Sequence, residues 1–167
     1  MEFLKRIKDL APQYEASLEH LITRFTLVQG GRAGTANEAT AWEQGKYFNT
    51  KYEAYMYATI IGLKADYKLK LTEGSKREKF IEIKSWQPSD LADYIIMGVL
   101  AKAHINFIEL EKKDEKDVEN EIKNVRRLLE EYANGGFDKI RAKLEKDPGY
   151  FENNENCLID FLDQANH

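Results

Sequence analysis

The sequence has few of the residues that build covalent or metal-held frameworks. Its 167 residues include one Cys, three His, three Pro and ten Gly. The lone cysteine, Cys157, excludes an internal disulfide framework and a thiolate zinc site. The three histidines, His20, His104 and His167, lie too far apart in sequence to form a spaced metal-binding motif. We therefore expect neither a structural metal nor another cofactor.

Long apolar runs are also lacking. Charged residues make up 32% of the chain and the mean hydropathy is −0.61, so no window approaches the roughly 18 uncharged apolar residues that span a membrane. Residues 1–9 alternate charged and apolar side chains and lack the apolar core of a signal peptide. We expect a cytoplasmic protein without a membrane partner.

What is present fits one globular domain over residues 1–167. A chain near this length buries roughly 70% of its unfolded surface, and its few Gly and Pro leave little room for linkers. The glycine-rich stretch at 30–35 lacks the Lys-Ser/Thr pair of a phosphate-binding loop and is expected to be a linker. The net charge of −4 argues against a surface that is basic throughout.

Apolar residues recur at intervals of three and four along most of the chain, which is typical of amphipathic helices. Thr50 followed by Glu53 has the pattern of a capping box and predicts the start of one helix. Another helix is expected to pack through a face that includes Leu91, Tyr94 and Ile95. The predicted helices cover residues 2–29 with an interruption at Pro12, 50–63, 88–104, 114–133 and 137–146, before a final apolar edge at 157–162. The expected fold is mainly α, a compact bundle of about six helices.

Segment 66–84 has a different period. Tyr67, Leu69 and Leu71 alternate with polar residues, and Ile81 and Ile83 do so beyond the central Gly74. This alternation predicts a short β-hairpin, although a charged loop between two helices would give a similar pattern.

The same region is the most basic part of the chain. Between residues 46 and 84, nine cations face five acids, a net charge of +4, and five tyrosines are interleaved. Lysines can neutralise phosphates and aromatic rings can stack on unpaired bases, whereas a solvated surface over core tyrosines would also produce this composition. The candidate nucleic-acid-binding residues are Lys46, Lys51, Lys64, Lys68, Lys70, Lys76 and Arg77. From residue 145 onward one cation faces six acids, which favours solubility or the docking of a basic partner.

One spacing within this region raises an enzymatic alternative. Asp66 precedes Glu82 and Lys84, an arrangement that resembles the acid and acid-x-lysine pattern of restriction-endonuclease-like nucleases. Two carboxylates on neighbouring strands could hold Mg²⁺, and the lysine could orient the attacking water. Alternation in an amphipathic hairpin would generate the same Glu-x-Lys pattern on an exposed strand.

The segment Glu130–Gly136, with the sequence EEYANGG, is the most distinctive motif. Asn134, Gly135 and Gly136 have the composition of a left-handed helix end, so we expect the preceding helix to stop there. The motif resembles a small bacterial family associated with DNA phosphorothioation (Dnd) defence systems, and FNTKYEAYMYATIIGL at 48–63 resembles a second block of that family. The resemblance covers residues 46–145. It leaves outside the first 45 residues, with the N-terminal helical segment 1–29, and the acidic C-terminal segment 146–167. The resemblance implies an accessory protein that is encoded near DNA-modification or anti-phage restriction genes. It assigns no catalytic residues.

The motif has both a structural and a docking interpretation. Its acids and Tyr132 could complete an amphipathic turn, or the segment could contact a partner subunit. The candidate docking residues are Glu130, Glu131, Tyr132, Asn134 and Phe137.

These observations favour a non-enzymatic accessory protein of a prokaryotic DNA-modification-linked defence system. It would act through a protein partner and through DNA contact by the basic region. The alternatives are a small Mg²⁺-dependent nuclease and a non-specific nucleic-acid-binding module. Self-association through the helix at 114–133 stays open, because an apolar stripe can be buried internally or against a second copy.

Overall fold

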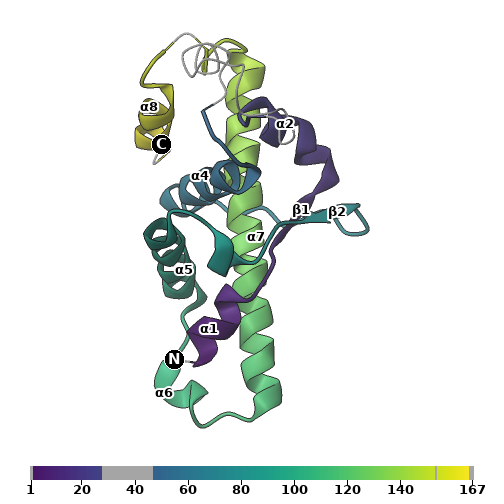
Figure 1. Ribbon diagram of the computed structural model, residues 1–167, viewed down its shortest axis with the longest axis vertical. Coiled ribbons are helices and arrows are strands. Elements are labelled where there is room, and N and C mark those ends of the chain that lie inside the picture. Colours follow the sequence, from purple (N-terminus) through teal and green to yellow (C-terminus); the bar gives the residue numbers. More distant parts are fainter. Residues whose placement is uncertain (1, 28–46, 153, 166–167) are drawn as a thin grey trace.

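The computed structural model describes residues 2–27, 47–152 and 154–165. The fold is mainly α, as predicted, and carries one small antiparallel sheet (Figure 1). The predicted linker at 30–35 lies outside the described residues. In chain order the elements are α1 (Glu2–Lys8), β1 (Gln13–Glu15), η1 (Ala16–Leu18), α2 (Glu19–Arg24), α4 (Lys51–Lys64), β2 (Arg77–Lys79), η2 (Ile83–Ser85), α5 (Ser89–Ala103), α6 (Phe107–Leu110), α7 (Glu115–Lys146) and α8 (Cys157–Gln164).

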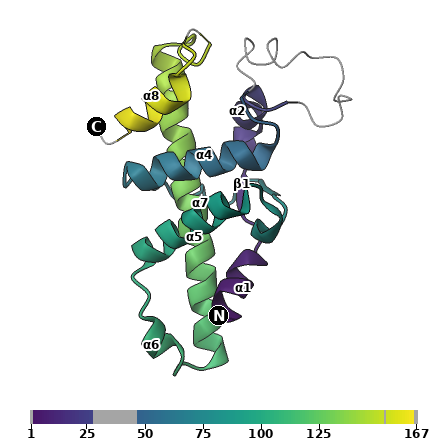
Figure 2. The ribbon, with the colours of Figure 1, turned by 60° about the vertical axis from the view of Figure 1, so that its left-hand side comes forward.

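Helix α7, with 32 residues, is the central element of the molecule. It runs along the longest axis, α4 and α5 cross it, and α1 lies against its N-terminal half, as Figure 1 and Figure 2 show. Asp114 caps its start by accepting a hydrogen bond from the Asp117 amide at 2.9 Å. The remaining helices are arranged around this single long element.

The predicted helix end at Asn134–Gly136 is wrong, because α7 continues to Lys146. A Cβ at Gly136 would overlap the carbonyl oxygen of Ala58 on α4, and a Cβ at Gly62 on α4 would overlap the carbonyl oxygen of Tyr132. The glycines therefore let two helical backbones approach closely, which is the use of glycine that a missing side chain permits.

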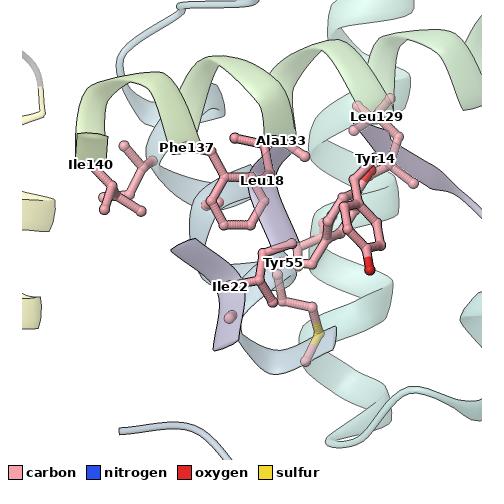
Figure 3. Packing of buried hydrophobic residues seen from close by; sticks show 14 of the residues in the cluster. Tyr14, Leu18, Ile22, Tyr55, Leu129, Ala133, Phe137 and Ile140 are labelled. Carbon is pink, nitrogen blue, oxygen red and sulfur yellow. The ribbon is translucent and has the colours of Figure 1, made fainter. Parts of the chain in front are cut away.

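The core forms on the α7 face that this crossing brings inward. Leu129, Ala133, Phe137 and Ile140 follow one another at spacings of four, four and three, and all are buried. They pack with Tyr55 of α4 and with residues of the N-terminal segment (Figure 3). The apolar stripe thus passes through the glycines without losing phase.

The two-stranded sheet is antiparallel, and β2 lies in the segment predicted to hold strands. Its partner is β1, with Tyr14 opposite Glu78, so the partner comes from the N-terminal segment instead of from residues 67–71. Residues 67–70 lie on α7: the Leu69 amide donates to the Glu131 carbonyl at 3.0 Å, and Asn134 Nδ2 donates to the Leu69 carbonyl at 3.1 Å. These bonds use the backbone groups that a hairpin ladder would have needed.

Two local predictions have different outcomes. The capping box at Thr50 and Glu53 is confirmed, since each side chain bonds the other residue's backbone amide. The helix predicted to reach residue 29 ends at Arg24, because the chain then pairs with residue 48: the Leu27 amide donates to the Phe48 carbonyl at 2.9 Å. Pro12 precedes β1, not a helix.

Gly136→Ala is expected to lower the free energy of unfolding by about 3 kcal/mol or more, because the added methyl group forces the backbones of α4 and α7 apart. Chemical denaturation followed by circular dichroism measures this loss. Gly98→Ala is the matched control: its Cβ would lie 3.2 Å from Leu63 Cδ1, a movable side-chain atom, and alanine gains about 1 kcal/mol of helix preference. Equal stabilities of the two variants would contradict the close crossing.

Candidate functional site

The EEYANGG motif is built into the interior of the protein. Glu130, only 7% exposed, accepts hydrogen bonds from the Gln13 backbone amide at 2.8 Å and from Arg126 Nε at 2.9 Å. A buried carboxylate needs such partners, because an unpaired charge away from water is costly. Glu130 therefore fixes the start of β1 to α7.

The other motif residues also make contacts inside the chain. Glu131 accepts a hydrogen bond from Arg127 at 3.0 Å, and the Tyr132 hydroxyl donates to Asp66 at 3.3 Å. Each of the five candidate docking side chains is less than a tenth exposed: Glu130, Glu131, Tyr132, Asn134 and Phe137. These side chains hold α4, β1 and segment 66–70 against α7, and a partner could reach them only by opening that packing.

The basic candidates divide into three groups. Lys46 lies outside the described residues. Lys51 pairs with Glu19, and Lys64 lies 3.3 Å from Asp163. The remaining four are exposed: Lys68, Lys70, Lys76 and Arg77. Of these, Lys76 lies 3.2 Å from Glu78, whereas the others form no ion pair within the described parts of the chain.

The proposed nuclease residues do not lie on two adjacent strands. Asp66 follows α4 with a left-handed backbone (φ 48°), and Lys102 hydrogen-bonds its carboxylate at 2.7 Å and lowers its pKa. Lys84, in η2, instead lies 2.9 Å from Asp9, and this hydrogen bond raises the lysine pKa. Glu82 is exposed and immediately precedes η2. The strand geometry on which the Mg²⁺ hypothesis depended is therefore not formed.

An apolar groove of about 530 Å³ lies between α4 and α5. Its lining side chains are mostly aliphatic: Ile60, Leu63 and Lys64 from α4, and Leu91, Tyr94, Ile95, Gly98, Ala101 and Lys102 from α5. Tyr94 is 75% exposed and Met97, on the same helix, is 59% exposed. Tyr94 was expected on the packed face, and this expectation is wrong.

The groove was missed, although the sequence holds a signal for it. Apolar residues occur around nearly the whole circumference of α5, where Ile95 and Val99 are buried while Tyr94 and Met97 remain outside. A helix that is apolar all round needs cover on more than one side. Large exposed apolar side chains gathered beside a groove are typical of an interaction surface.

A second cleft, of about 580 Å³, lies beside the sheet. Tyr14, Phe80 and Ile81 contribute apolar surface, and the ring centroids of Tyr14 and Phe80 are 4.6 Å apart. Lys51 and Tyr52, from the first turn of α4, belong to the lining. This cleft contains two of the basic candidates, Lys51 and Lys76, and two acids, Glu19 and Glu78.

The described ranges lack a metal-binding cluster and a membrane-spanning helix. Residues 2–27, 47–152 and 154–165 contain no group of three or more His, Cys, Asp or Glu side chains placed to hold a metal ion. No helix within the same ranges is long and apolar enough to cross a membrane.

Comparison with known proteins places the chain in a family. No curated protein and no solved structure matches it. A family model described as DNA sulphur modification system-associated protein 4 matches residues 37–166. This range confirms the resemblance found at 46–145 and extends it through most of the acidic C-terminal segment. Because the match covers most of its length, the chain belongs to the family of DNA sulphur modification system-associated protein 4.

Proposed function

We propose that the protein is a non-enzymatic accessory subunit that binds a protein component of a DNA sulphur modification system through the α4–α5 groove. The family association supplies the context, and the exposed apolar groove is the observation that supports protein contact. Burying Tyr94 and Met97 against a partner would contribute roughly 1.5–3 kcal/mol for each side chain.

The lining of the groove indicates the kind of segment that fits it. Helices α4 and α5 lie side by side and end on the same side in Figure 2, so Lys64 and Lys102, near their C-terminal ends, mark one end of the groove. An amphipathic helix places apolar side chains at positions i, i+3, i+4 and i+7, which suits a groove of this kind. Both lysines already have acidic partners, Asp163 and Asp66, so the apolar lining alone defines the partner segment as a helix with an apolar stripe.

The test is co-expression with the protein components of a DNA sulphur modification system from the same organism. One component is expected to co-purify with the wild type, and the double variant Tyr94→Ser/Met97→Ser is expected to bind it at least about tenfold more weakly. Ile108→Ser is the matched control, because Ile108 is 73% exposed but belongs to α6. Unchanged binding by the double variant, or no component bound by the wild type, would contradict the proposal.

DNA contact is a second candidate, supported by the exposed cations of segment 68–77. Lys68, Lys70 and Arg77 have no ion-pair partner among the described residues and could each neutralise a phosphate. Replacing all three by Ala should weaken duplex binding and flatten its salt dependence by about 0.9 per lost contact. Electrophoretic mobility shifts at low and moderate salt measure this change.

The same titration with and without Mg²⁺ tests the nuclease alternative. We expect no Mg²⁺-dependent cleavage, since Asp66 is engaged by Lys102 and Lys84 by Asp9. Cleavage by the wild type that disappears in Glu82→Ala/Lys84→Ala would establish the nuclease and refute the accessory role. In the same titration, DNA binding that is insensitive to salt and to the triple Ala substitution would contradict the prediction that segment 68–77 contacts DNA.

A further inference from the structure

The outer edge of β2 is an open sheet edge. The Ala16 amide donates to the Lys76 carbonyl at 2.9 Å, and the Phe80 amide donates to the Pro12 carbonyl at 3.0 Å. In an antiparallel pair, hydrogen-bonded positions alternate with positions whose backbone groups point outward. Arg77 and Lys79 occupy the outward positions, so their N–H and C=O groups face away from β1. Within residues 2–27, 47–152 and 154–165, β1 is the only strand paired with β2.

The cleft beside the sheet is lined by residues of β2 and its flanks. Lys76, Glu78 and Phe80 alternate along the chain and line this cleft, together with Lys79 and Ile81. Tyr52 of α4 and Ile81, which is 47% exposed, add apolar surface to the lining. A strand added to the outer edge would direct every second side chain toward this partly apolar space.

Paired and unpaired charges both occur along β2. Lys76, which lines the cleft, is paired with Glu78. Arg77 and Lys79 are exposed and form no ion pair with any described residue, and Lys79 also borders the cleft. An added strand would therefore meet aromatic and aliphatic side chains in the cleft and two unpaired cations along the edge itself.

We propose that the outer edge of β2 binds an extended segment of a partner protein in which acidic and apolar residues alternate. Its backbone pairs with the N–H and C=O groups of Arg77 and Lys79, its acidic side chains pair with these two cations, and its apolar side chains enter the cleft beside Tyr52 and Phe80. Backbone pairing supplies affinity and the alternate side chains supply specificity, as in other cases of strand addition. This contact is independent of the α4–α5 groove.

The edge fits a peptide better than a nucleic acid. The outward N–H and C=O groups recur at the spacing of a β-strand, which a peptide backbone can match and a sugar–phosphate backbone cannot.

Fluorescence anisotropy with the full chain tests this proposal, using a fluorescein-labelled peptide of alternating Glu and Val with capped ends. Lys79→Pro removes one outward N–H and leaves the β1 ladder intact, because that N–H does not point at β1. Lys79→Gln is the matched control, which loses the charge but keeps the N–H. We expect the Pro variant to bind at least about tenfold more weakly than the Gln variant.

A second probe separates lost pairing from lost folding. The same peptide N-methylated at alternate residues cannot donate along one edge, and the wild-type protein should bind it at least about tenfold more weakly than the parent peptide. Equal affinity for the two peptides, equal affinity of the two variants with unchanged circular dichroism, or no peptide binding by the wild type would each overturn the proposal. Displacement of the peptide by an equal concentration of single-stranded thymidine oligonucleotide would assign the edge to nucleic acid and also overturn it.

Discussion

The close crossing of α4 and α7 is the contact on which the rest of the structure depends. It requires glycine on both helices, Gly62 on one and Gly136 on the other, because neither position leaves room for a Cβ. Once the backbones meet, Phe137 and Tyr55 pack in the same core and segment 67–70 lies along α7. A helix interior pays about 1 kcal/mol for each glycine, and the buried apolar surface around the crossing offsets that cost.

The EEYANGG motif is therefore not itself an exposed surface, but it positions the elements that carry the exposed surfaces. Glu130 holds β1 against α7, and β1 in turn positions β2 with its open edge. The α4–α7 crossing also determines where α4 lies relative to α5, and thus forms the groove that contains Tyr94. The side chains of the motif are buried, but a substitution among them would accordingly alter both exposed surfaces, the β2 edge and the α4–α5 groove, by displacing the elements that form them.

The features that were predicted correctly from the sequence depend on neighbouring residues. The capping box of Thr50 and Glu53 is local and was found, as were the helical class and the family. The helix end predicted at Gly135 and Gly136 rested on the local preference of glycine for helix ends, and tertiary packing overrode that preference. The helical spacing of Leu129, Ala133, Phe137 and Ile140 continues through the glycines and indicated one continuous helix. The partner of β2, the pairing of Asp66 with Lys102 and the pairing of Lys84 with Asp9 depend on contacts distant in sequence, which one sequence without tertiary information does not specify. To predict the groove from the sequence, one would need to know that other elements cover only one side of α5.

Amide hydrogen exchange at Gly135 and Gly136 tests the central claim most directly. If α7 is continuous and clamped by α4, these two amides should exchange as slowly as those of Ala133 and Phe137, through global unfolding alone. Exchange as fast as that of Gly74, which lies in an exposed turn with φ 75°, would show that α7 breaks at the motif and would contradict the crossing from which both proposed surfaces follow.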